Sequence, residues 1–520
     1  MTKKTYTVVF AFIFILEVIF GYYVAVHLPY INGDAISRVA NAFYVLYSRD
    51  PHLAAVGFIW NPLPSFLAMP VLLFQPWLPT LSSAGLSSVI ITSAFAGLTA
   101  VVLLQAFYKN LGSATFFGIA CTLLFVLNPF QFWYGANGMS EALFGFFLLV
   151  SVIHWTQWIR DNSVHSLTMV SLMLSLAFLT RYEAIPFSAA IVFATFWYML
   201  AKKSVFAKIE STLLMLLLPV LFTVTVWLVL NYTIMGDALY FLHSSYSNAG
   251  QSEFLADNPV MSVLIGNPEA SFKFVCKRIA VFAIPYAVLL LFRLLSRTAL
   301  RWDFLVFTVL TFSIPLFQWY MLYGGLSFGW LRFFYYPLLI TIAWLPYELS
   351  SNAQPSMARA LKPSMLAALA VSAVLVVPVM NNASLSPEEY SVIHYRDSAT
   401  YQKTLLNRKI SQKLDREIFD SDPNALVIAD SFNAFEIILN SRNPRRFVNT
   451  TDRDFKAVLD QPLKFHVEYL LVPKPEGLSA LNAVHVKYPL LYEGNADWAK
   501  LVFDIDDRWK LYRIVGEPHP

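Results

Sequence analysis

The chain has 520 residues, of which 57% are apolar, 16% are aromatic and only 13% are charged. This composition excludes a soluble enzyme, because soluble globular proteins carry roughly 25% charged residues. The net charge of +4 is small for this length and forms no basic stripe, which argues against a nucleic-acid partner.

Apolar runs predict about eleven membrane-spanning helices within the first 380 residues. The first run, Val8 to His27, is long enough to cross ~30 Å of hydrocarbon, and we interpret it as a retained signal anchor. The other runs lie near residues 86–107, 115–127, 142–158, 167–179, 185–200, 213–230, 279–295, 304–322, 334–347 and 365–380.

The charged residues predict how these helices are oriented. With the N-terminus in the cytoplasm, 12 of the 19 basic residues in the first 380 positions lie on the cytoplasmic side, as the positive-inside rule requires. Eight of the 13 acidic residues then lie on the outer side: Asp34, Asp50, Glu141, Glu183, Asp237, Glu253, Asp257 and Glu269. We therefore expect a multi-pass protein of the plasma (inner) membrane, and an odd number of spans sends its C-terminal tail outside the cytoplasm.

The domain organisation follows from the same patterns. Residues 1–380 are expected to form the transmembrane domain, with outer loops at 28–85 and 232–278, and residues 381–520 a soluble domain that holds 38 of the 70 charged residues. The first loop contains a helix-like stretch from Ala35 to Tyr47 and a short apolar piece from Leu63 to Phe74, which suits an interfacial or re-entrant helix.

The tail is expected to form a small α/β domain. A charged helical stretch runs from Ser391 to Phe419, and β-rich runs follow at 425–429, 435–439, 467–472, 500–503 and 509–515. A role in support or acceptor recognition and a role as a lid over the outer loops both remain open.

Four polar segments lie at outer ends of apolar helices. They are Gly33–Arg38 with Asp34, Asn137–Phe144 with Ser140 and Glu141, Thr180–Pro186 with Arg181 and Glu183, and Gly324–Pro337 with Arg332. Each has a simpler explanation: Asp34 or the Ser140–Glu141 pair as helix caps, Arg181 and Glu183 as a mutual ion pair, and Arg332 as a snorkelling belt residue. Together, two carboxylates and two arginines at headgroup level suit a reaction between a phosphate-bearing lipid and a hydroxyl acceptor.

The same segments carry a resemblance to a known family. In order and topology, residues 1–380 resemble the GT-C superfamily of membrane glycosyltransferases, which includes the protein O-mannosyltransferases and the bacterial aminoarabinose transferase. The likeness rests on Asp34 after the first helix, the Ser140–Phe144 helix entry, the Arg181–Glu183 turn and Arg332-Phe333-Phe334 before Pro337. Ala35 stands where those two groups usually carry the second residue of an Asp-Glu pair.

This resemblance implies a chemistry and a set of roles. The donor would be a polyprenyl-phosphate sugar, the acceptor a hydroxyl of a lipid, glycan or protein, and the reaction a direct displacement that inverts the anomeric carbon. Asp34 would be the base, with Glu141 as a second catalytic candidate, and Arg181, Arg332 and Arg38 would bind the donor phosphate. The sugar or acceptor pocket would be drawn from Trp60, Asn61, Tyr134, Tyr182, Glu183 and His243.

The resemblance also bears on cofactors. No cofactor is required by this chemistry, since a phosphate is already a good leaving group. The chain lacks the Trp-Trp-Asp signature of the oligosaccharyltransferases, which argues against a lipid-pyrophosphate donor and a required metal. The need for a divalent metal stays open.

Two other classes of function compete with this interpretation. A polytopic transporter or flippase for a lipid-linked or anionic substrate would also use charges inside the membrane, such as Glu17 in the first span. We expect Glu17 to be buried and hydrogen-bonded, without a catalytic role. A noncatalytic assembly or sensor protein with an outer domain is the third class.

Overall fold

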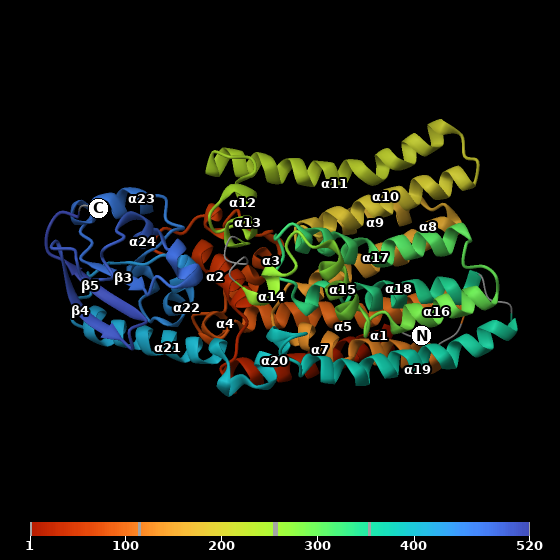
Figure 1. Cartoon of the computed structure of the whole chain (residues 1–520), viewed down its shortest axis with the longest axis horizontal. Coiled ribbons are helices and arrows are strands. Elements are labelled where there is room, and N and C mark those ends of the chain that lie inside the picture. The colour runs from red at the N-terminus through yellow and green to blue at the C-terminus, as the bar shows by residue number, and fades with distance from the viewer. Residues whose placement is uncertain (1–2, 113–115, 253–257, 352–354, 519–520) are drawn as a thin grey trace. The chain divides into compact units, whose positions relative to one another are not determined.

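The computed structural model describes residues 3–112, 116–252, 258–351 and 355–518 (Figure 1). The chain forms two compact units, each built from three separate stretches. The first unit comprises residues 1–21, 89–233 and 255–394, and the second comprises residues 22–88, 234–254 and 395–520. The predicted first loop, residues 28–85, therefore belongs to the same compact unit as most of the tail.

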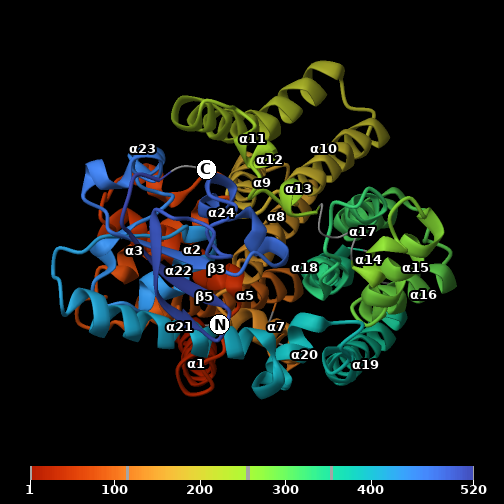
Figure 2. The ribbon, with the colours of Figure 1, turned by 60° about the vertical axis from the view of Figure 1, so that its left-hand side comes forward.

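Helices make up the first unit. They are α1 (Lys3–Tyr22), α5 (Leu86–Leu111), α6 (Phe116–Val126), α7 (Pro129–Ala136), α8 (Glu141–Asp161), α9 (Val164–Phe178), α10 (Ala184–Ala201), α11 (Phe206–Met235), α14 (Pro259–Ser262), α15 (Pro268–Ile279), α16 (Ile284–Leu295), α17 (Trp302–Tyr323), α18 (Tyr336–Ser351), α19 (Pro355–Met380) and α20 (Pro387–Ile393). Helices α8, α9 and α10 pack side by side, α8 also contacts α18, and α16 packs on α19 (Figure 2).

Each of the eleven predicted apolar runs overlaps one of these helices. Among the described residues, seven helices are long and apolar enough to cross a membrane, so this is an integral membrane protein. The pairs α6–α7 and α15–α16 are bent by 63° and 93°, and counting each as one broken span raises the number to nine. The predicted number of eleven is not confirmed. Thr115, the first residue of the third run, and Glu253 and Asp257 of the second outer loop lie outside the described residues.

Pro129 and Asn128 account for the bend between α6 and α7. Proline has no backbone N–H to continue the preceding helix, and it is well tolerated at the first position of a new one. The side chain of Asn128 accepts a hydrogen bond from the backbone N–H of Phe130 and so caps α7. The chain therefore starts a new helix at this point with its first donors partly satisfied.

Glu17 of α1 is completely buried, as expected, but the expected hydrogen bond is not found. Neither carboxylate oxygen has a hydrogen-bond partner among the described residues. A Cβ at Gly135 of α7 would overlap this carboxylate, so the glycine is what allows α7 to approach α1 at this point. Close backbone packing occupies the space in which a polar partner would stand.

The second unit combines short helices with a sheet. Its helices are α2 (Gly33–Tyr47), α3 (Leu63–Leu72), α4 (Thr80–Ser83), α12 (Tyr240–His243), α13 (Asn248–Ser252), α21 (Ala399–Leu414), α22 (Ser431–Asn440), α23 (Phe455–Asp460) and α24 (Ala483–Lys487). Helices α2 and α3 lie where the sequence predicts them. Helix α2 contacts both α3 and α22, which ties the first loop to the tail.

The sheet has five strands in the order β2-β1-β3-β5-β4. They are β1 (Val427–Ile428), β2 (Phe447–Val448), β3 (Tyr469–Pro473), β4 (Ala499–Ile505) and β5 (Trp509–Ile514). Strand β1 pairs in parallel with β2 and β3, whereas β3–β5 and β4–β5 are antiparallel. The predicted α/β character of the tail is confirmed.

One predicted strand is wrong and one strand was not predicted. Residues 435–439 lie in α22, whose N-terminus is capped by Asp430: its side chain accepts a hydrogen bond from Phe432 N at 2.8 Å. Most of α22 is buried, and a short apolar run inside a buried helix looks the same as a buried strand in sequence. Strand β2 has only two residues, too few to show any alternation.

Candidate active site

Three of the four predicted polar segments meet in the first unit. Glu141 is the first residue of α8, Arg181 and Glu183 lie in the turn between α9 and α10, and Arg332 lies in a short 3₁₀ helix (Leu331–Phe333) that leads into α18. Glu388 of α20 joins them. These five side chains form what we call the arginine–carboxylate cluster.

Arg181 is at the centre of this cluster. Its Nη1 donates to Glu141 Oε1 at 2.5 Å and to Ser140 Oγ at 3.2 Å. On its other edge, Nη2 and Nε donate to the two carboxylate oxygens of Glu183 at 2.6 and 3.2 Å, a two-point arrangement matched to the planar guanidinium. All three nitrogens of Arg181 therefore have partners from the turn and from α8.

Arg332 approaches Glu141 from a different element. Its Nε lies 3.4 Å from Glu141 Oε1, and its Nη1 lies 3.0 Å from Glu388 Oε1. The guanidinium groups of Arg181 and Arg332 lie 5.3 and 5.4 Å from the centre of the Phe333 ring. A shared carboxylate and a shared aromatic ring thus hold two positive charges close to each other.

Tyrosines and a second glutamate of α20 adjoin the cluster. Tyr134 of α7 donates to Glu389 Oε1 at 2.6 Å, and Tyr335 donates to the backbone carbonyl of Glu141 at 3.1 Å. Tyr134, Tyr335 and Glu389 are fully or almost fully buried. Glu141 and Glu389 are therefore buried beside tyrosine side chains.

Burial and charge act against each other in this cluster. Burial disfavours the charged form of Glu183, but the Arg181 guanidinium outweighs it and holds the pKa of Glu183 below its ordinary value. Burial, reinforced by the negative charge of Glu141, raises the pKa of Glu389. Arg278 of α15 is also buried and interacts electrostatically with Glu389. A proton on Glu389 would leave three carboxylates facing three guanidinium groups.

The structure also tests the simpler explanations for Ser140, Arg332 and the Arg181–Glu183 pair. Ser140 makes no side-chain capping bond and instead accepts from Arg181. Arg332 does not snorkel, because only 4% of it is exposed. The pairing of Arg181 with Glu183 is present, but it extends to Glu141.

The predicted base Asp34 and the predicted phosphate-binding residue Arg38 belong to the second unit. Asp34 is the second residue of α2 and is exposed, while the N-cap position is held by Asn32. Asp34 is therefore not the cap, but it lies in the first turn, where the helix dipole still favours a negative charge. Arg38, one turn further along α2, is half-buried.

The predicted pocket residues are divided between the units. In the second unit Trp60 is half-buried, Asn61 is buried, and His243 is exposed with its Nδ1 2.7 Å from Asp237 Oδ2. In the first unit, the hydroxyl of Tyr182 accepts from Trp227 Nε1 at 3.2 Å.

Sequence reasoning missed Glu388 and Glu389. They stand in Pro387-Glu388-Glu389-Tyr390, shortly after the last apolar run and before the predicted tail helix. Two adjacent carboxylates just after the last apolar run were a usable signal. As for metals, no three His, Cys, Asp or Glu side chains within the described ranges gather in a way that could hold an ion.

Comparison with known proteins finds a structural similarity but no match in sequence. No protein-family model matches the chain, and no curated protein matches its sequence. Among solved structures, the chain is similar to the apo oligosaccharyltransferase of Archaeoglobus fulgidus, with 10% identity and a TM-score of 0.40 over 93% of this chain and 70% of that one. At this level of similarity the match sets no residue-by-residue correspondence.

Proposed function

We propose that this protein is a membrane glycosyltransferase of the GT-C kind, which transfers a sugar from a polyprenyl-phosphate donor to an acceptor hydroxyl on the outer face of the membrane. The observation that carries the proposal is the pair of buried guanidinium groups of Arg181 and Arg332, which meet at one oxygen of Glu141. Buried arginines at the ends of apolar helices suit a ligand that has a lipid tail and a phosphate head.

Arg332 is the guanidinium better placed to take the phosphate. Arg181 is engaged through all three nitrogens, and its role is to orient Glu141 and keep positive charge near the phosphate. Arg332 Nη1 faces Glu388, whose side chain is 21% exposed, the largest value among the carboxylates paired in this cluster. Glu388 would therefore occupy the phosphate position in the absence of donor and give it up when the donor binds.

The reaction is a single displacement at the anomeric carbon. The acceptor oxygen forms the new bond as the bond from the anomeric carbon to the phosphate oxygen breaks. The electron pair leaves on the lipid phosphate, where the guanidinium groups stabilise the growing charge. The acceptor's proton passes to a carboxylate, and the anomeric configuration inverts.

Asp34 is our candidate for the base, with Glu141 as the second. Asp34 is exposed and stands in the first turn of α2. Glu141 binds Arg181 through Oε1, while its Oε2 is buried and makes no hydrogen bond to any described residue. That oxygen is able to accept a proton, or a hydrogen bond from a sugar hydroxyl, without breaking an existing hydrogen bond.

The test is transfer by purified protein in lipid nanodiscs supplied with a polyprenyl-phosphate sugar and a hydroxyl-bearing acceptor. The protein should release polyprenyl phosphate, and Arg332→Ala should abolish most of the release, whereas Arg396→Ala, at an exposed tail residue, should not. A transporter or flippase would move the intact lipid-linked sugar without releasing the phosphate. Movement without release would therefore reject the proposed reaction.

A further inference from the structure

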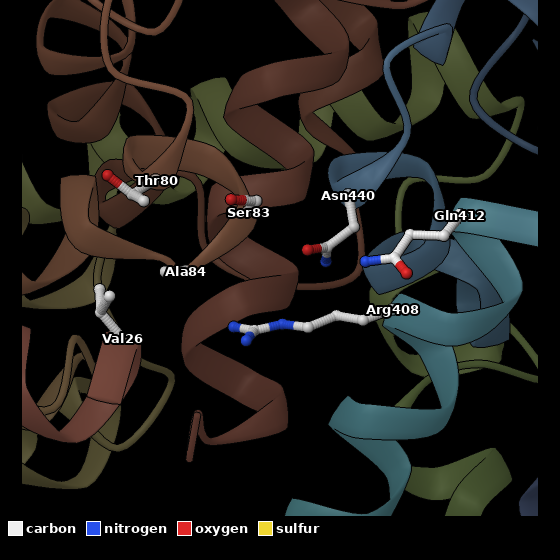
Figure 3. Close-up of a pocket in the computed structure, with 7 residues that line it drawn as sticks. All are labelled: Val26, Thr80, Ser83, Ala84, Arg408, Gln412 and Asn440. Atoms are coloured by element: carbon white, nitrogen blue, oxygen red, sulfur yellow. The ribbon is translucent and has the colours of Figure 1, made fainter. Parts of the chain in front are cut away.

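A polar cavity lies entirely within the second unit. Its volume is about 220 Å³, and it is lined by Val26, by residues of α4 (Thr80–Ser83) and Ala84 just after it, by α21 and by the end of α22. Figure 3 shows Arg408 and Gln412 reaching from α21 toward Thr80 and Ser83, with Asn440 beside them. At ~30 Å³ per water, this space corresponds to about seven waters, which is enough for a small ligand.

The side of α21 that includes the cavity residue Arg408 carries further polar atoms without partners, although of these residues only Arg408 lines the cavity. Thr404 Oγ1, both amide atoms of Asn407, Arg408 Nε and Ser411 Oγ are buried and make no hydrogen bond to any described residue. Their spacing of three and four residues places them on one side of the helix. Buried polar groups are nearly always satisfied in native proteins, by protein or by water, so Arg408 Nε in the cavity lining is a donor that water or a ligand in the cavity would satisfy.

Two further buried atoms make no hydrogen bond within the described part of the chain. Thr80 Oγ1 on α4 belongs to the cavity lining, whereas Glu436 Oε2 on α22 lies outside it. Burial lowers the pKa of Arg408, and the nearby Glu436 carboxylate acts in the opposite direction. One positive group therefore lines the cavity, and one negative group lies within electrostatic range of it.

These donors and acceptors indicate which class of ligand fits the cavity. Guanidinium and amide N–H groups are donors, amide and carboxylate oxygens are acceptors, and hydroxyls are both. A phosphate offers only acceptors at its charged oxygens and would be repelled by Glu436. A sugar ring donates and accepts around its edge, and its C–H groups would pack on Val26 and Ala84.

We propose that this cavity binds one neutral saccharide unit, which makes the second unit a glycan-binding module. The proposal goes beyond the transfer reaction and does not depend on it. For a ligand of about twelve non-hydrogen atoms, the expected Kd is in the millimolar range.

The test measures sugar binding to the full-length protein in nanodiscs by saturation-transfer NMR, with a parallel thermal melt. The probes are mannose, galactose, N-acetylglucosamine and arabinose, with inorganic phosphate as the counter-probe. Arg408→Gln should weaken binding at least tenfold because it removes the N–H donors of the guanidinium group. Lys409→Gln is the matched control, since Lys409 is exposed on the same helix and pairs with Asp506.

A second variant separates binding from folding. Ala84→Leu fills the cavity but removes no polar group, so it should abolish sugar binding while the melting temperature is kept or raised. The Arg332→Ala variant, impaired in donor binding, should bind sugar normally, so failure of the transfer reaction would leave this result intact. Absence of binding by all four sugars, normal binding by folded Ala84→Leu, or displacement of sugar by phosphate would overturn the proposal.

Discussion

Donor binding should respond in opposite directions to two substitutions in the arginine–carboxylate cluster. Glu388→Gln removes the carboxylate that faces Arg332 Nη1 at 3.0 Å, and Arg332→Ala removes the guanidinium itself. If Glu388 occupies the phosphate position, the first change should strengthen binding of polyprenyl phosphate and the second should weaken it.

The magnitudes follow from burial. The Glu388 side chain is 21% exposed, so the ion pair lies at the upper end of the range for partly exposed pairs, about 1 kcal/mol. Without Glu388 competing with the phosphate for Arg332, the Kd of the donor should fall by about fivefold. Arg332 is 4% exposed, and a charge-assisted bond to phosphate is worth about 1.5–3 kcal/mol, so its loss should weaken binding by about 10- to 150-fold.

Titration of polyprenyl phosphate against both variants in nanodiscs, with a thermal melt of each, measures these effects. Glu269→Gln is the matched control, because Glu269 is an exposed carboxylate paired with Lys273. Weaker or unchanged donor binding in a folded Glu388→Gln variant would refute the displacement of Glu388 by phosphate. Unchanged binding in Arg332→Ala would remove Arg332 from the site.

Three further predictions concern the base, the topology and the pH dependence. Asp34→Asn should lower turnover by roughly 10²–10⁴ while donor binding and melting temperature stay near wild type; if only Glu141→Gln is inactive in the same assay, Glu141 is the base. Cysteines placed at Ser37 and Ser384 should react with a membrane-impermeant reagent in intact cells, and reaction only after lysis would reverse the topology. Burial lowers the pKa of His485, so the unfolded chain takes up a proton before the folded chain does as the pH falls, and stability should be lost below about pH 6.5. The melting temperature of His485→Gln should therefore change less between pH 7 and 5 than that of wild type, and an equal change would contradict this.

The sequence alone determined the helices of the membrane part. A run of twenty apolar residues folds as a helix in any apolar surroundings, because its backbone groups must bond to one another. It also determined the parts of the tail where alternation is clear, such as β5, and the positions of α2 and α3. These features depend on residues close together in the chain.

The tertiary structure decided what depends on distant residues. Residues 435–439, which are apolar except for Glu436, fit either a strand or a helix, and only the cap at Asp430 and burial by the rest of the unit made them part of α22. The number of spans depends on bends such as that at Pro129, which composition does not reveal. Glu388 pairs with Arg332 across 56 residues of chain, and no local pattern encodes that contact. The sequence supplied the charges of the site, and the packing of α8, the α9–α10 turn, α18 and α20 decided which of them meet.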